Sequence, residues 1–265
     1  MPHDESQVIF DEPLINFADG DDRIFEEYKD IIAPVHLTPR EALAKAYDKK
    51  PGELPKHLPV ISWIMPVTEE TRKTNRKEKT TPSHLWAYTR WYGEKFNDAL
   101  RKHMVEFLTK SQYLVVTPVL QPYFRIEDND REPFSNWSER HIAYAAGLGT
   151  FSLSDGFITE RGIAHRCGSV VTDLILPPTE RTARDPFSNC LFYVDGSCNT
   201  CIARCPAQAI SEKGHDKKKC NTYVRKDIGY LREKYKVGIT GCGLCQTEVP
   251  CEYQNRTRKR NGTRL

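Results

Sequence analysis

The sequence has no long hydrophobic run, no large excess of one charge and no cysteine in its first 166 residues. The longest apolar stretches, residues 59–67 and 114–120, are far shorter than the roughly 18 residues of a membrane-spanning helix, so we expect no membrane segment. A net charge of +3 without a local basic patch does not indicate a nucleic-acid partner, and we expect none. Neither an export signal nor a twin-arginine pair follows Met1, and we expect a cytoplasmic protein.

The composition, 38% hydrophobic and 28% charged, is that of a globular protein with an ordinary core. All nine cysteines lie between Cys167 and Cys251, which indicates a separate module for metal or disulfides. Because reducing cytosol keeps thiols free, clustered cysteines there bind metal more often than they form disulfides. The sequence therefore predicts a metal-binding module in the C-terminal part of the chain.

The cysteine spacing indicates iron–sulfur clusters. The run Cys198-x2-Cys201-x3-Cys205-Pro206 reproduces the last three cysteines and the proline of the bacterial ferredoxin motif. That motif would begin at Asp195, and Cys190 is the candidate replacement. In two-cluster ferredoxins the cysteine before the proline ligates the other cluster, so two interleaved sets are expected. The predicted ligands are Cys190, Cys198, Cys201 and Cys251 for one 4Fe–4S cluster and Cys205, Cys220, Cys242 and Cys245 for the other.

Zinc is the alternative metal, because two sites of four thiolates each could use the same eight cysteines. The cysteine–proline step and the helix-starting residues 206–210 favour the ferredoxin interpretation. Cys167, the ninth cysteine, is expected to be a small buried core residue, with an axial or redox role as the weaker alternative.

The residues before the cysteines show helical and extended patterns in alternation, as in a mixed α/β domain. Residues 1–58 are expected to cap a larger domain, and residues 72–79, with five basic side chains in eight, to form a solvated loop rather than a phosphate-binding patch. The aromatic stripe of residues 85–108 is expected to pack in the core. The expected helices are residues 23–31, 39–49, 83–111 and 138–147, and the expected strands are residues 60–65, 114–117 and 170–174.

Three segments and the cysteines carry a family resemblance. The segments are Ala146-Gly147-Leu148-Gly149, then Gly156–Thr159, then Arg166 with Val170–Leu174. Over roughly residues 60–253 the chain resembles the cobalamin-dependent reductases, namely the reductive dehalogenases and the epoxyqueuosine reductases. The resemblance implies an α/β (α+β) fold, with a nitroreductase-like corrinoid-binding domain at residues 1–185, a ferredoxin-like module with two 4Fe–4S clusters at residues 186–255, and a basic tail at residues 256–265.

The resemblance also implies a cofactor site and partners. Glycines and small or hydroxyl side chains let backbone approach a large ligand closely. The residues that would line the corrinoid are Gly147, Leu148, Gly149, Thr150, Phe151, Ser152, Leu153, Ser154, Asp155, Gly156, Ile158 and Thr159. The candidate proton donors or anion holders are Glu139, Arg140, His141, Tyr92 and Arg166. The implied partners are a small-molecule substrate and a low-potential electron donor such as a ferredoxin or flavodoxin.

Two departures from the family shape the expected function. The aspartate of the epoxyqueuosine reductase motif D-S-A-P would fall at Pro133, with Asp130 and Glu132 nearby, and no helical-repeat domain follows Cys251. We therefore expect an oxidoreductase that acts on a small electrophile. A cobalamin-free electron-transfer protein that serves a partner enzyme is the alternative. A weaker third interpretation is RNA binding through a tail that contains Arg256, Arg258, Lys259, Arg260 and Arg264, for which a solvated terminus is favoured.

Overall fold

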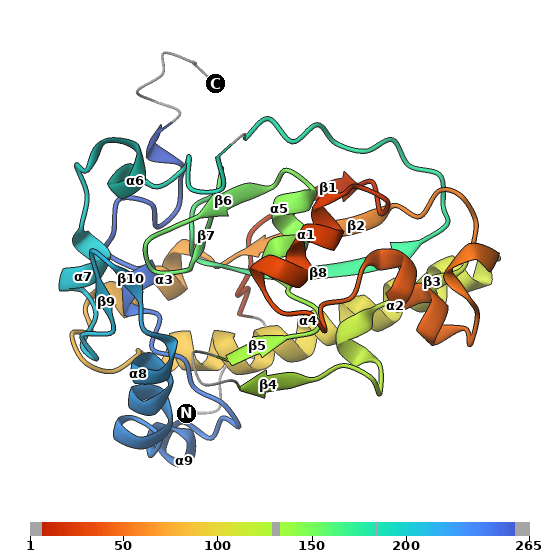
Figure 1. The fold of residues 1–265 in the computed structure, drawn as a ribbon. Helices are drawn as coiled ribbons and strands as arrows, with labels where there is room; N and C mark the ends of the chain where they lie inside the picture. Colours follow the sequence, from red (N-terminus) through yellow and green to blue (C-terminus); the bar gives the residue numbers. More distant parts are fainter. Residues whose placement is uncertain (1–6, 129–132, 184, 258–265) are drawn as a thin grey trace.

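The computed structural model describes residues 7–128, 133–183 and 185–257, and its centre is a four-stranded antiparallel sheet (Figure 1). The strands, in order across the sheet, are β1 (Leu14–Ala18), β2 (Val60–Pro66), β8 (His165–Thr172) and β3 (Val115–Val116). Every residue of β2 is buried, as its β-branched and aromatic composition predicts. The mixed α/β class and the strand expected at residues 60–65 are confirmed.

Helices cover both faces of the sheet. The large ones are α1 (Ile24–Ile31), α2 (Pro39–Ala46), α4 (His84–Lys110) and α5 (Glu139–Ala145). Alternate side chains of β2 point to opposite faces, so each face has its own core. Val60 and Ile64 pack with α1, α2 and α5, whereas Ile61, Trp63 and Met65 pack against α4. The result is a three-layer arrangement with the sheet in the middle.

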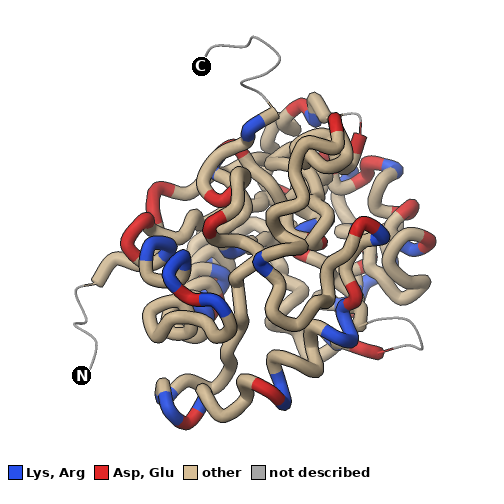
Figure 2. Tube along the Cα trace, turned by 90° about the vertical axis from the view of Figure 1, so that its left-hand side faces the viewer, with Lys and Arg blue, Asp and Glu red and all other residues tan. Residues whose placement is uncertain are grey.

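Shorter elements complete the part of the chain before residue 186. In the side view, acidic and basic residues lie interspersed along the chain (Figure 2). Among the helices of the described residues, none combines the length and hydropathy that a membrane span requires. The shorter elements are η1 (Pro51–Glu53), α3 (Glu69–Arg76), η2 (Pro118–Leu120), β4 (Ile126–Asp128), β5 (Pro133–Ser135), β6 (Gly149–Phe151) and β7 (Phe157–Thr159).

The C-terminal part from residue 186 consists of short helices and turns, which gather at one end of the molecule (Figure 1). Its division into a separate ferredoxin-like module stays a prediction. The elements are α6 (Leu191–Asp195), α7 (Thr200–Ala203), β9 (Ile210–Ser211), β10 (Gly214–His215), α8 (Lys217–Thr222), the π-helix η3 (Tyr223–Asp227), α9 (Leu231–Tyr235) and η4 (Leu244–Gln246).

Residues 1–58 do more than cap the domain, because residues 14–18 form an edge strand of the central sheet. Leu14 pairs with Ile64 and Ala18 with Val60, in antiparallel register. The five-residue strand has a mixed burial pattern and lies before two helices, so local sequence gave little sign of it. The helices expected at residues 23–31 and 39–49 are confirmed to within a few residues.

The long helix α4 is confirmed, but its buried face differs from the expected aromatic stripe. Ser83 caps the helix by accepting a hydrogen bond from the backbone of Trp86. Phe96 and Phe107 are more than half exposed, at 55% and 58%, whereas Arg101 is only 1% exposed. Polar residues lie on the buried face because they pair with β8 and α5, elements that are distant in the sequence.

Candidate functional site

The cysteines of the first predicted set lie around one apolar pocket. Cys190 immediately precedes α6, Cys201 lies in α7, and Cys251 lies after η4 in the chain. Four members of the set line the pocket together with Cys245 of the other set. The remaining lining residues are Ser152, Ser154, Ile158, Asn189, Leu191, Phe192, Val249, Pro250 and Arg256. The thiols therefore point into a space that is largely shielded by apolar side chains.

The effects of neighbouring thiols on one another's pKa show the same grouping. Burial, followed by the neighbouring Cys190 and Cys198, raises the pKa of Cys201 to about 12. The pKa of Cys251 is raised first by burial and then by Cys190, Cys201 and Cys198. A buried thiol becomes a thiolate only when a positive charge such as a metal compensates it. This grouping is the donor set that a 4Fe–4S cluster takes.

The second predicted set is gathered in the same way. Burial, together with the neighbouring Cys220 and Cys205, raises the pKa of Cys242 to about 12. Burial raises the pKa of Cys245, and Cys242, Cys220 and Cys201 of the first set also raise it. The two sets therefore adjoin each other at Cys201 and Cys245. This is the arrangement expected of interleaved ligands.

In the described ranges, no three His, Cys, Asp or Glu side chains are close enough together to hold a single metal ion. Thiolates of a mononuclear zinc site all lie about 2.3 Å from the ion, so they must crowd together. The cysteines here instead line a space between them, at least in the first set. Which metal the cysteines hold stays a prediction.

A buried ion-pair cluster anchors the segment that carries Cys251. Glu252 is 2% exposed and accepts hydrogen bonds from Arg72, at 3.1 Å, and from Arg76, at 2.6 Å. Both arginines belong to α3, so the expectation of a solvated loop at residues 72–79 is wrong. The cause is a partner about 180 residues away in the sequence, which local pattern does not show. Glu252 thereby fixes the backbone next to a predicted cluster ligand.

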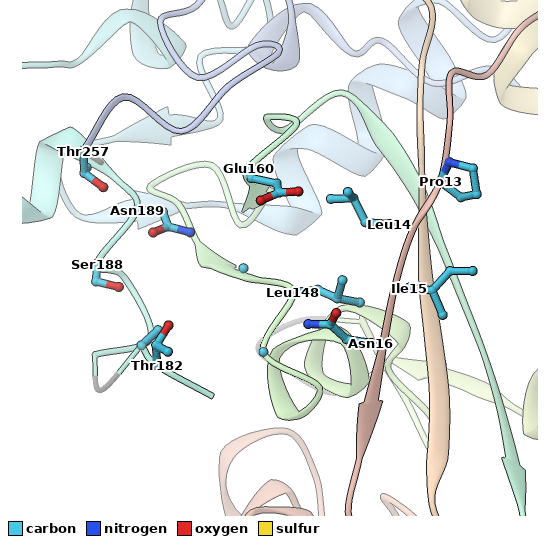
Figure 3. A pocket seen from close by; sticks show the side chains of 13 residues that line it. Pro13, Leu14, Ile15, Asn16, Leu148, Glu160, Thr182, Ser188, Asn189 and Thr257 are labelled. Carbon is cyan, nitrogen blue, oxygen red and sulfur yellow. The ribbon is translucent and has the colours of Figure 1, made fainter. Parts of the chain in front are cut away.

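A larger pocket of about 480 Å³ lies on the other side of Asn189 (Figure 3). In this view Thr182, Ser188 and Asn189 lie on one side and Ile15 and Asn16 on the other. The remaining lining residues are Pro13, Leu14, Gly147, Leu148, Gly149, Glu160, Ala183 and Thr257. Its size is in the range of sites for small molecules, which runs from about 300 to 1,000 Å³.

Asn189 connects the larger pocket to the cysteine pocket, because it lines both. Its side chain donates to the carbonyl of Ile158 at 2.8 Å and accepts from Asn255 at 2.8 Å, and its backbone N–H donates to Thr150. The residue directly precedes Cys190. Sequence analysis missed Asn189 and Glu252, although each is the neighbour of a predicted cluster ligand and could have been found on that ground.

The residues predicted to line a corrinoid form the end of α5 and the β6–β7 hairpin. Gly147, with φ +72°, ends the helix, and it lines the larger pocket together with Leu148 and Gly149. The other nine do not line that pocket. The hydroxyls of Ser152 and Ser154 lie 3.1 Å apart and share a hydrogen bond, and Thr159 donates to the carbonyl of Gly162.

The backbone of the β6–β7 hairpin also makes close contacts within the protein. A Cβ on Gly149 would lie 2.3 Å from the carbonyl oxygen of Ile158, so the residue is glycine to fit its own hairpin. Asp155, at the turn with φ +56°, lies 3.3 Å from His215 and ties the hairpin to the C-terminal part. Residues 150–159 thus make several of their polar contacts within the protein, and corrinoid binding stays a prediction.

The five candidate proton donors or anion holders do not converge on one site. Glu139 is buried, and it pairs with Arg101 at 3.0 Å and accepts from Ser169 at 2.6 Å. Burial raises the pKa of Glu139, against the effect of Arg101. Arg166 pairs with Glu94, which also pairs with Arg101. Glu139 and Arg166 thus belong to one buried network between α4, α5 and β8.

The other three candidates lie elsewhere. Arg140 donates to the backbone carbonyl of Asp155. His141 shares a hydrogen bond with Ser138 at 2.8 Å, and burial lowers its pKa to about 3, so the ring is neutral at pH 7. Tyr92 is 37% exposed and lies against Tyr88, at 4.3 Å between ring centroids. None of the five lines the larger pocket, and their catalytic roles stay predictions.

The structure also places two further residues from the sequence analysis, Cys167 and Arg256. Cys167 packs against the main core, and burial raises its pKa to about 12, which agrees with the expected core role. Arg256 donates to the carbonyl of Pro250 and lines the cysteine pocket, so it is not part of a solvated tail. The rest of the basic tail, together with Asp130 and Glu132, lies outside the described residues.

The fold and the site define a mixed α/β protein with two four-cysteine groups beside a pocket. No protein-family model matches the chain. The chain is 34% identical over 119 residues to the epoxyqueuosine reductase of Bacillus anthracis, and 30% identical over 120 residues to that of Staphylococcus aureus. Each alignment covers 43% of this chain and 29% of the relative. The chain thus spans less than a third of the length of these two curated relatives.

The similarity extends to the fold. A solved structure of a selenomethionine-labelled epoxyqueuosine reductase aligns with 94% of this chain and 66% of its own, with a TM-score of 0.51 and 16% identity. Another, of an epoxyqueuosine reductase with an epoxyqueuosine-modified tRNA stem loop, aligns with 92% of this chain and 62% of its own, with a TM-score of 0.48 and 19% identity.

These relatives support one expectation and overturn another. Both curated relatives are named as reductases, in agreement with the predicted oxidoreductase. The expectation that nucleic acid is not a partner is wrong for proteins of this kind, because a solved epoxyqueuosine reductase holds a tRNA stem loop. Net charge was a poor basis for this expectation, because a modest overall value does not describe the local surface to which a nucleic acid binds.

Proposed function

We propose that the chain is an iron–sulfur reductase of the epoxyqueuosine reductase type, which acts on a modified nucleoside carried in tRNA. The observation that carries the proposal is the place of Asn189, which lines both the cysteine pocket and a larger polar pocket. An electron carrier next to a substrate pocket is what a reductase requires. When bound, the two 4Fe–4S clusters would supply low-potential electrons.

The residues of the cysteine pocket would hold and shield the first cluster. Leu191, Phe192 and Val249 keep water from the thiolates, which matters because solvent exposure and hydrogen bonds set cluster potential. Glu252, held by Arg72 and Arg76, fixes the backbone beside Cys251. Cys201 and Cys245 line the same pocket, which supports a short path for electrons from one cluster to the other.

The larger pocket would bind the electron acceptor. Its polar side chains are Asn16, Glu160, Thr182, Ser188, Asn189 and Thr257. These amides, hydroxyls and one carboxylate suit the many hydrogen-bonding groups of a nucleoside. The corrinoid that the family resemblance implies would contact the chain here, at Gly147–Gly149, rather than along the hairpin. The small-molecule substrate expected from the sequence is replaced in this proposal by a nucleoside within RNA.

The test is a turnover assay with an epoxyqueuosine-containing tRNA stem loop. The anaerobically purified protein, with a chemical or flavodoxin reductant, is incubated with the stem loop in the presence and absence of cobalamin. Removal of the epoxide oxygen as water takes two electrons and two protons, and mass spectrometry of the nucleosides detects the product. Conversion under either condition supports the proposal, and the comparison shows whether cobalamin is required.

A matched pair of variants ties the activity to the pocket. Ser188→Leu places a bulky side chain in the larger pocket, whereas Ser111→Leu places the same side chain on the exposed end of α4. We expect the first to lose turnover at unchanged iron content and the second to keep both. Clusters that are intact and reducible, with no conversion under any condition, would instead favour the electron-transfer protein.

A further inference from the structure

A separate cavity of about 140 Å³ lies between α4, the start of β8 and residues 241–246. This is the space of four or five water molecules, at about 30 Å³ each. Gly243, with φ +65°, lets the C-terminal part close over it, because a Cβ there would lie 2.1 Å from the ring of Trp86. The lining residues are Val67, Trp86, Thr89, Arg90, His165, Arg166, Gly241, Gly243 and Gln246.

The cavity wall carries two cations and no carboxylate. The described residues that line the cavity include Arg90 and Arg166 but neither Asp nor Glu. Within the described residues, the ion pairs of both arginines are with Glu94 alone, which lies 3.9 Å from Arg90 and is shared with Arg101. The nearby Arg166 cation, followed by burial, lowers the pKa of Arg90 to about 10. Two neighbouring guanidiniums therefore share one carboxylate.

A buried hydroxyl on the same wall has no partner. Thr89 is 2% exposed, and its Oγ1 makes no hydrogen bond to any described residue. Buried polar groups in proteins are almost always satisfied, so an unpaired hydroxyl beside two cations indicates a missing acceptor. His165 does not supply it, because its ring nitrogens contact the Phe157 carbonyl at 2.7 Å and the Cys167 thiol at 3.5 Å.

We propose that this cavity binds a small oxyanion, a phosphate or carboxylate group, through Arg90, Arg166 and the hydroxyl of Thr89. Guanidinium groups present planar pairs of N–H donors that match the oxygens of both anions. The bound anion supplies the acceptor that Thr89 lacks and the negative charge that Glu94 provides only in part. The site does not depend on what the eight cysteines hold or on which substrate occupies the larger pocket.

The test is direct binding, measured by isothermal titration calorimetry on the anaerobically purified protein. Sodium phosphate and sodium acetate are titrated separately at constant ionic strength. We expect saturable binding of at least one, and each of Arg90→Gln and Arg166→Gln weakens it about 10- to 100-fold, the loss of one charged hydrogen-bonding group. Arg161→Gln is the matched control, because Arg161 lines a different cavity, and it leaves the affinity unchanged.

Thr89→Val keeps the test valid if an arginine variant unfolds. It removes only a hydroxyl that has no partner in the protein, so we expect an unchanged or higher unfolding temperature without anion and a several-fold weaker affinity. Tighter binding of phosphate identifies a phosphate-bearing ligand, and tighter binding of acetate identifies a carboxylate. No binding of either at tens of millimolar, or equal weakening by Arg161→Gln, overturns the proposal.

Discussion

The buried arginine of α4 gives the sharpest test of the packing described above. Arg101 is 1% exposed and pairs with Glu94 at 3.0 Å, Asp98 at 2.7 Å and Glu139 at 3.0 Å. It also donates to the carbonyl of Cys167 at 3.1 Å, so it joins α4 to α5 and β8. Arg101→Met keeps the length of the side chain and removes its charge and its donors.

The size of the effect follows from what the substitution leaves behind. Glu94 retains Arg166, and Asp98 is partly exposed, but Glu139 keeps only the hydroxyl of Ser169. Removing one partner of a buried ion pair costs about 3–5 kcal/mol. For a chain of this size, about 2–4 °C of unfolding temperature corresponds to each kcal/mol, so we expect a decrease of roughly 6–20 °C.

The pH dependence separates a charge effect from a packing effect. Burial already raises the pKa of Glu139, and loss of Arg101 raises it further. A carboxyl whose pKa is raised on folding destabilises the protein above its unfolded pKa and is relieved as pH falls through the folded pKa. The cost of Arg101→Met should therefore shrink toward acid, and the added change Glu139→Gln should recover about 0.5–3 kcal/mol at pH 7.

The assay is thermal unfolding under anaerobic conditions, followed by circular dichroism at one fixed scan rate, because unfolding of such a protein is a kinetic as well as an equilibrium quantity. Arg23→Met is the matched control, since Arg23 is 89% exposed in a surface pair and its loss should not be measurable. An unfolding temperature within about 2 °C of wild type, or a cost that Glu139→Gln does not reduce, would refute the charge network.

Two further predictions concern other buried charges. Glu252→Gln should lower stability by about 3–5 kcal/mol, because it leaves two arginines of α3 around an uncharged amide; the exposed control Glu69→Gln should change nothing measurable, and equal effects in thermal unfolding would contradict the burial argument. Stability should also fall as pH decreases below about 6.5, since burial lowers the pKa of His36 and His165 to about 4 and of His141 to about 3. The unfolded chain takes up these protons first, so urea titrations from pH 7.5 to 5 should show a loss on the order of a few kcal/mol, and a flat profile would exclude neutral buried rings.

Local sequence sufficed wherever one segment determines its own structure. The β-branched run at residues 60–65 and the Ser83-capped helix were predictable from periodicity and capping. The grouping of the cysteines also follows from spacing, because short intervals between ligands leave few ways to share two sites. The structure brings Cys190, Cys198, Cys201 and Cys251 to one pocket, and their roles as cluster ligands stay a prediction.

Sequence failed wherever a distant partner decides the outcome. The basic run at residues 72–79 was predicted to be solvated, but Arg72 forms an ion pair with Glu252. The buried face of α4 was predicted to be aromatic, but it includes Arg101, which forms an ion pair with Glu139. Periodicity measures hydrophobicity along one element, and it does not register an ion pair between elements far apart in the chain. The internal hydrogen bonds of the serine and threonine residues in the β6–β7 hairpin are likewise a tertiary feature that the local sequence does not show.

The most direct test of the central claim is the iron and acid-labile sulfide content of the anaerobically purified chain and of three cysteine variants. Two 4Fe–4S clusters predict about eight irons per chain in the wild type and about four in Cys190→Ala and in Cys220→Ala, one variant from each set. Cys167→Ala should retain about eight, because Cys167 packs against the core, apart from both sets. Zinc in place of iron, or an iron content that neither Cys190→Ala nor Cys220→Ala changes, would contradict the account.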